Sequence, residues 1–177
     1  MISYRSDGLS LCVIFSIVLM LLSGCSSSKT AYKLEEKMAE RHYDFDRRHI
    51  SEKRKRICSE AVDWVGTPYR YAMQDKKVGT DCSGMVLAVF NNVLGVKLPR
   101  NSAKQASFCK EIDLKDLRPG DLLFFATGKD PDRISHVGIA LSREEFVHAS
   151  TSKGVVVSKI NTPYYSRTLR KCALMPE

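Results

Sequence analysis

Apolar residues near the start of the folded region recur at helical spacing. Ile57, Ala61, Trp64 and Val65 lie three to four positions apart, which places them on one face of a helix. The Gly-Thr-Pro sequence at 66–68 would end that helix. The pattern predicts a first helix that buries these four side chains, followed by an irregular stretch over residues 69–81.

A second helical pattern begins at Cys82. Apolar residues continue at helical spacing to Leu94, Asp81 is placed to cap the start of this helix, and Gly95 is placed to end it. A shorter helix is expected over residues 102–108. The order of these patterns predicts that the helices come first in the domain.

Later in the chain the pattern changes to short runs rich in β-branched and aromatic residues. Such runs, separated by turns, are typical of strands. They cover residues 122–125, 136–141, 146–149, 155–160 and 169–174. Helices followed by an antiparallel meander are typical of an α+β domain. We therefore expect one α+β domain over residues 51–177, with helices packed on an antiparallel sheet of about five strands.

The beginning of the chain has a different composition. Residues 11–22 form an apolar run after Arg5, which fits a signal-peptide core of about 7–15 residues and is short of the roughly 20 that span a membrane. The run ends in Leu-Ser-Gly-Cys at 22–25, which resembles the lipobox of bacterial lipoproteins. We expect a signal peptide over 1–24, lipidation of Cys25, and a polar, lipid-anchored tether over 25–50. A plain secretory signal or a short uncleaved anchor is the alternative.

Charge and export together narrow the class of partner. The net charge of +8 and the pI near 9.2 suit nucleic acid, a phospholipid surface or an anionic cell-wall polymer, or no specific partner at all. Because every interpretation of the first residues places the domain outside the cytoplasm, a nucleic-acid partner is disfavoured. The membrane is expected as a partner through the lipid on Cys25.

Four cysteines remain once the signal and the lipidation site are set aside: Cys58, Cys82, Cys109 and Cys172. They do not form paired CxxC motifs, so a structural zinc or redox motif has no support. If Cys82 is catalytic, at most one intramolecular disulfide can form among the others. We expect Cys58 and Cys172 to be buried free thiols.

The candidate chemistry depends on Cys82 and two histidines. A thiol in the first turn of a helix faces unpaired N–H groups and the positive end of the dipole, which favour the thiolate. Such a nucleophile needs a base, and the predicted domain contains only His136 and His148. They share a sheet face if the intervening loop has an odd number of residues or a bulge supplies the shift, and lie on opposite faces if a regular four-residue loop joins the strands. Zinc ligation by the same three residues is the alternative.

Six short motifs, in order, resemble the NlpC-type cell-wall peptidases, which are papain-like cysteine hydrolases of peptidoglycan. The motifs are Gly-Thr-Pro-Tyr at 66–69, Asp-Cys-Ser-Gly at 81–84, Leu-Pro-Arg at 98–100 with Ser102 and Gln105, Pro-Gly-Asp-Leu at 119–122, His-Val-Gly-Ile at 136–139 and Val-His-Ala at 147–149. The resemblance covers residues 51–177. It departs from the family at Ala72-Met73-Gln74, where relatives usually have a glycine pair, so specificity is expected to differ there.

The resemblance implies a role for each site residue. Cys82 would be the nucleophile, His136 the general base and His148 the residue that orients His136. In the oxyanion site, the hydroxyl of Tyr69 would join the backbone N–H of Cys82.

Two further residues beside Cys82 would help to bind substrate. They are Asp81 and Ser83. The alternative role of Asp81 is that of a helix cap, and the alternative for Ser83 is that of a polar residue in the first helical turn. For Tyr69 the alternative is an aromatic side chain that only packs. No cofactor and no metal are expected.

The same resemblance implies a peptidoglycan endopeptidase that cuts a peptide bond to diaminopimelate, either in a stem peptide or across a cross-link. The alternatives are a non-catalytic lipoprotein that binds wall peptides, or an amidase or acyltransferase on the same fold. We expect a monomer, held on the cell envelope by its lipid. In a cell with two membranes the residue after the lipid cysteine, Ser26, favours the outer membrane, facing the periplasm.

Overall fold

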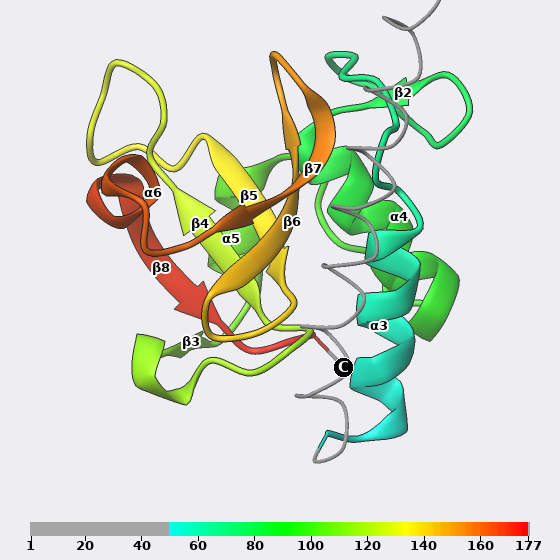
Figure 1. Ribbon diagram of the computed structural model, residues 1–177, viewed down its shortest axis with the longest axis horizontal. Coiled ribbons are helices and arrows are strands. Elements are labelled where there is room, and N and C mark those ends of the chain that lie inside the picture. The colour runs from blue at the N-terminus through cyan, green and yellow to red at the C-terminus, as the bar shows by residue number, and fades with distance from the viewer. Residues whose placement is uncertain (1–49, 177) are drawn as a thin grey trace, which may run out of the picture. The chain divides into compact units, whose positions relative to one another are not determined.

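A computed structural model describes residues 50–176 of the chain (Figure 1). The predicted signal peptide, lipidation site and nearly all of the tether therefore lie outside the described residues. None of the helices in the described part is long and apolar enough to cross a membrane. The elements follow in the order α3 (Glu52–Val62), β1 (Gln74–Asp75), β2 (Gly79–Thr80), α4 (Cys82–Leu94), α5 (Ser102–Phe108), β3 (Glu111–Ile112), a 3-10 turn (Leu114–Asp116), β4 (Leu122–Phe125), β5 (His136–Ala140), β6 (Glu145–Ser150), β7 (Gly154–Lys159), α6 (Pro163–Thr168) and β8 (Leu169–Ala173).

The predicted α+β architecture is confirmed. Within residues 50–176 the main sheet has six antiparallel strands in the order β3-β8-β4-β5-β6-β7, and β1 and β2 form a separate two-stranded ribbon. The strand beyond the expected five is β3, which has only two residues and is too short to show an alternating pattern. The ribbon lies in the stretch expected to be irregular, for the same reason.

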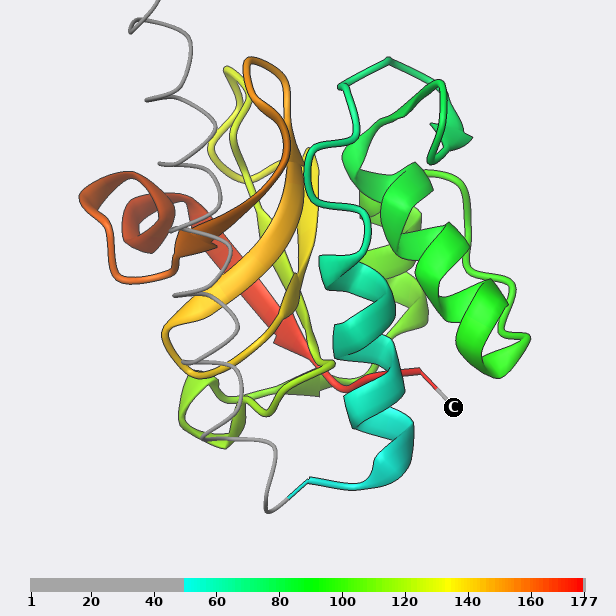
Figure 2. The same ribbon diagram turned by 45° about the vertical axis from the view of Figure 1, so that its right-hand side comes forward.

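Helices α3 and α4 cover one face of the sheet, and α6 lies on the other (Figure 2). Each strand alternates its side chains between these two faces, so each face has its own apolar core. On the helical face Met85 and Phe90 of α4 pack with Ile139 of β5. On the opposite face Phe125 and Phe146 pack together, with ring centroids 5.1 Å apart.

Helix α3 is shorter than the apolar spacing predicts. It ends at Val62, and tight turns follow, in which the N–H of Trp64 donates to the Ala61 carbonyl and the N–H of Val65 donates to the Val62 carbonyl. Trp64 is still buried, as expected, but the turn leaves Val65 45% exposed. The prediction that Val65 belongs to the buried face was wrong because the helical spacing ends before it.

All four cysteines in the described residues are buried, and Cys82, Cys109 and Cys172 are free thiols. This confirms the expectation for Cys172 and the expected burial of Cys58. Cys109 is packed in the core on the helical face of the sheet, whereas Cys172 belongs to the core on the opposite face. The sheet therefore separates these two thiols.

A buried carboxylate connects the first helix to the end of the domain. Asp121 is fully buried and accepts hydrogen bonds from the Arg54 guanidinium at 2.8 Å, from the N–H of Arg118 at 2.9 Å and from the N–H of Met175 at 2.9 Å. The bond from Arg118 closes the turn that the Pro-Gly-Asp motif predicted. The other two bonds join α3 and the segment after β8 to that turn.

Candidate active site

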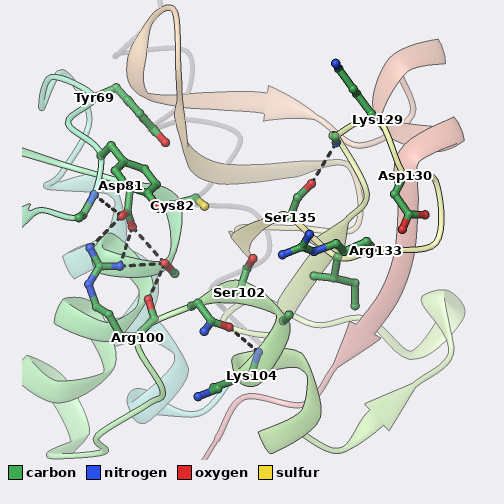
Figure 3. A pocket seen from close by; sticks show the side chains of 17 residues that line it. Tyr69, Asp81, Cys82, Arg100, Ser102, Lys104, Lys129, Asp130, Arg133 and Ser135 are labelled. Atoms are coloured by element: carbon green, nitrogen blue, oxygen red, sulfur yellow. Dashed lines mark hydrogen bonds and ion pairs between the residues drawn. The ribbon is translucent and has the colours of Figure 1, made fainter.

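Cys82 occupies the first position of α4 because the residues around it start the helix there. The Asp81 carboxylate accepts the N–H of Gly84 as an N-cap, and Gly95 ends the helix in the left-handed conformation at φ 71°. Both predictions for this helix are confirmed. The capped start fixes Cys82 at the edge of a cleft with a volume of about 790 Å³ (Figure 3).

The environment of the Cys82 sulfur differs from the sequence-based expectation. Burial raises the pKa of Cys82 to about 11, although backbone N–H groups of Val137, Ser83 and Cys82 itself act to lower it. The helix start was expected to favour the thiolate, but loss of contact with water outweighs that effect. At neutral pH Cys82 is therefore a thiol, with N–H groups nearby that can stabilise the thiolate once a proton is removed.

The loop between β5 and β6 decides the relation between the two histidines. Ile139 pairs with Val147, and Leu141 N–H donates to Glu145, so three residues form the turn. This odd number puts His136 and His148 on the same face, as one of the two predicted alternatives required. The Nε2 atom of His136 lies 2.9 Å from Nδ1 of His148.

His136 belongs to the strand that packs beside Cys82. It is the residue before Val137, whose N–H points at the Cys82 sulfur, and α4 packs against β5. Because Nε2 of His136 bonds to His148, Nδ1 is the ring nitrogen that could face another partner. The structure thus places Cys82 beside the strand that bears His136 and bonds His136 to His148. For these three residues the sequence predicts the roles of nucleophile, base and orienting residue.

Burial keeps both imidazoles neutral. It lowers the pKa of His136 to about 4, and burial together with the nearby charge of His136 lowers the pKa of His148 to about 3. If His136 accepts a proton on Nδ1, its own proton is on Nε2 and is donated to Nδ1 of His148. The remaining proton of His148 is then on its Nε2.

Two residues that the sequence analysis missed hold that Nε2 atom. The Ser158 hydroxyl lies 3.0 Å from Nε2 of His148, and the Tyr165 hydroxyl also lies 3.0 Å from it. Both hydroxyls can accept the Nε2 proton, so they can fix the tautomer of His148 and, through it, that of His136. A relay of hydrogen bonds therefore runs from His136 through His148 to β7 and α6.

Tyr69 is a residue of the cleft wall. It lines the cleft together with Cys82, and its hydroxyl points into the cleft (Figure 3). Burial, with the nearby Cys82 and Asp81, raises the pKa of Tyr69. The phenol is therefore a protonated hydrogen-bond donor at neutral pH.

Asp81 is fully engaged within the protein. One oxygen accepts from Gly84 N–H, the Ser83 hydroxyl and Arg100 Nη1, and the other accepts from Ala72 N–H and Arg100 Nη2, at 2.8–3.0 Å. Burial acts to raise the pKa of Asp81, but the bonds from Arg100 and Gly84 outweigh it and lower the pKa. Through the bond from Gly84, Asp81 acts as the helix cap that was the alternative to a substrate-binding role.

Ser83 is engaged in the same network. Its hydroxyl also bonds the Arg100 carbonyl at 2.8 Å and accepts from Arg100 Nη1 at 2.9 Å. Asp81 and Ser83 therefore order the wall of the cleft around Arg100.

The departure from the family at Ala72 has a visible backbone consequence. Ala72 has φ 61°, a left-handed conformation, and this turn aims its N–H at Asp81. A residue with a Cβ is disfavoured there by about 1–2 kcal/mol, and glycine is not. Glycine also raises the conformational entropy of the unfolded chain, which lowers the stability of the fold by about 0.4–1 kcal/mol.

The variant Ala72→Gly is therefore expected to be more stable than the natural chain by about 0.5–1 kcal/mol, measured by urea unfolding. Ala103→Gly, within helix α5, is the matched control. It should be less stable by about 0.5–1 kcal/mol. Destabilisation by both substitutions would show that Ala72 is not strained.

Among residues 50–176, no three His, Cys, Asp or Glu side chains are arranged to hold a metal ion. The two site histidines instead bond to each other and to hydroxyl groups.

Residues 66–173 match the NlpC/P60 family. The chain belongs to the NlpC/P60 family. The predicted resemblance and the assignment to a family of cysteine peptidases are thereby confirmed.

Curated NlpC/P60 relatives carry enzyme names. A protein of Haemophilus influenzae named "Probable endopeptidase" is 42% identical over 111 residues, which are 63% of this chain and 68% of the relative. A protein of Escherichia coli K12 named "Murein DD-endopeptidase MepS/Murein LD-carboxypeptidase" is 35% identical over 162 residues, or 85% of this chain and 84% of the relative.

A solved NlpC/P60 structure has the same fold. The protein from Bacillus cereus ATCC 10987 superposes with a TM-score of 0.64 over 69% of this chain, at 24% identity. The match covers 40% of that longer chain, so this likeness concerns the domain alone.

Proposed function

We propose that this chain is a murein endopeptidase that cuts a peptide bond through a Cys-His-His thioester mechanism. The observation that carries the proposal is the placement of Cys82 at a capped helix start beside the β5 strand that bears His136, with His148 bonded behind it at 2.9 Å. A nucleophile, a base and an orienting group in this order suit acyl transfer.

The first half of the reaction forms the thioester. The Cys82 proton passes to Nδ1 of His136 as the sulfur attacks the substrate carbonyl carbon. The oxygen of the tetrahedral intermediate accepts hydrogen bonds from the backbone N–H of Cys82 and the hydroxyl of Tyr69. His136 then gives its proton to the leaving nitrogen, the C–N bond breaks, and the amine product departs.

The second half restores the enzyme. A water molecule gives a proton to His136 and its oxygen attacks the thioester carbon. The C–S bond breaks, the proton returns from His136 to the sulfur, and the acid product leaves. Throughout, His148 accepts the Nε2 proton of His136, while Ser158 and Tyr165 keep His148 in the tautomer that can do so.

The bond we propose is the one between D-alanine and diaminopimelate in a cross-link. The support is the name of the E. coli relative, a DD-endopeptidase that aligns with 85% of this chain. The bond between D-glutamate and diaminopimelate within a stem is the second candidate. We further propose export and anchoring to the cell envelope through lipid on Cys25, supported by the sequence at 11–25.

Mass spectrometry of purified murein after incubation with the protein tests this function, with Cys82→Ala as the blank. New fragments made by the unmutated protein alone are expected, and their masses distinguish a cut cross-link from a cut stem. Release of whole stems from the sugar would instead indicate an amidase. If neither whole murein nor isolated muropeptides yield fragments, the non-catalytic binding protein becomes the better interpretation.

A further inference from the structure

The cleft beside Cys82 has unbalanced charge. Its lining contains four cationic side chains, Arg100, Lys104, Lys129 and Arg133, but only two carboxylates. The first cation and one of the carboxylates neutralise each other, because Arg100 forms a two-pronged ion pair with Asp81. What remains is three cations and the carboxylate of Asp130.

Two of the three remaining cations, Lys129 and Arg133, are on the loop between β4 and β5, across the cleft from Arg100 and Asp81 (Figure 3). Lys104 is on α5 and lines the cleft on the side of Arg100. All three are exposed, and within residues 50–176 none of them forms an ion pair. Arg133 extends across the cleft toward Ser102, whereas the Asp130 carboxylate accepts the N–H of Asp132 in its own loop.

We propose that Lys104, Lys129 and Arg133 form a subsite for the free carboxylates of the murein peptide. The proposal rests on the proposed murein endopeptidase function and extends it to the choice of substrate. Murein stem peptides carry carboxylates on their D-glutamyl and diaminopimelyl residues, and these groups occur either as free acids or as amides. A cleft lined by cations favours a peptide with free carboxylates, because an amidated peptide has no negative charge there for the cations to attract.

The opposite wall reinforces this selection. Both oxygens of Asp81 already accept hydrogen bonds from protein donors, and the three remaining cations outnumber the one remaining carboxylate, Asp130. The lining therefore favours the acidic groups of the peptide over a free ammonium group. A stem that is still joined to its sugar meets these conditions.

The test uses two synthetic cross-linked peptides that differ only in whether these carboxylates are free acids or primary amides. We expect the full-length protein to prefer the free acid by about tenfold in kcat/KM at low ionic strength, mainly through KM. The preference should shrink as salt screens the exposed cations. Equal cleavage of both peptides would overturn the subsite and leave the endopeptidase intact.

Two charge-matched variants locate the effect. The triple variant Lys104→Gln, Lys129→Gln, Arg133→Gln should retain less than about twofold preference for the free acid. The control variant Lys53→Gln, Lys97→Gln, Lys159→Gln removes three exposed lysines outside the cleft and should keep the full preference. If the cleft variant keeps the preference for the free acid, another site is responsible for it. If the control variant loses the preference equally, net charge is responsible; either outcome overturns the subsite.

Cleavage of neither peptide would count against the proposed function alone. In that case calorimetric titration of both peptides into the Cys82→Ala protein decides the subsite. Tighter binding of the free acid, lost in the cleft variant, supports it, and equal binding of the two peptides overturns it.

Discussion

Alanine in place of Cys82 or His136 is expected to lower kcat for murein cleavage by about ten-thousandfold or more. In the proposed mechanism Cys82 supplies the atom that bonds to the substrate, and His136 supplies the proton transfers on which both halves of the reaction depend. Because the two act as a unit, the double variant should be no slower than either single variant. Release of labelled muropeptides over time, at saturating substrate, measures these rates.

The pH profile distinguishes loss of the base from general damage to the site. His136 has a pKa near 4, so it is neutral and able to accept a proton above that pH, and protonated below it. Since the Cys82 thiol has a pKa near 11, kcat/KM should rise through pH 4 and then stay level to about pH 10. In His136→Ala the residual rate should instead climb with pH as hydroxide generates the thiolate. A normal, level profile in that variant would contradict the assignment of His136 as base.

Loss of the Arg54 side chain is expected to be the most damaging change to stability away from the cleft. The variant Arg54→Met leaves Asp121 without the cation that neutralises it in a fully buried position. Breaking a buried pair from one side costs about 3–5 kcal/mol, because the remaining charge stays buried. The free energy of unfolding in urea should fall by about that amount.

Lys115→Met provides the comparison for Arg54→Met. Lys115 pairs with Asp113 at 3.3 Å, but both side chains are more than 70% exposed. The loss should be under about 1 kcal/mol. Similar losses in the two variants would mean that burial of Asp121 adds nothing to the value of its ion pair.

Much of the fold follows from local pattern. The five predicted strands agree with β4 to β8 to within a residue or so at each end, because each presents a run of β-branched or aromatic residues between turns. Two-residue strands such as β3 have no period to detect. Helix α6 was missed although Thr162 caps it and Pro163 opens it, a recognisable start signal, because only six residues follow that signal.

The candidate site was only partly accessible to sequence reasoning. Cys82, His136 and His148 could be selected from residue type and position, and the register of one hairpin turn decided whether they met. Ser158 shares its parity along β7 with Val156, the partner of His148, so a known register would have placed it on the same face. Tyr165 gave no such signal, because its contact with His148 depends on where α6 packs on the sheet, which local sequence does not reveal. The pKa of Cys82 depends on burial, which local sequence does not reveal.

The Asp121 cluster also fixes which end of the domain lies nearest to residue 50. Arg54 and the N–H of Met175 contact the same carboxylate oxygen, so the domain's first helix and its last residues meet at one pole. The loops around the cleft lie at the other pole (Figures 1 and 2). If the domain is attached through residue 50, its cleft therefore faces away from the point of attachment.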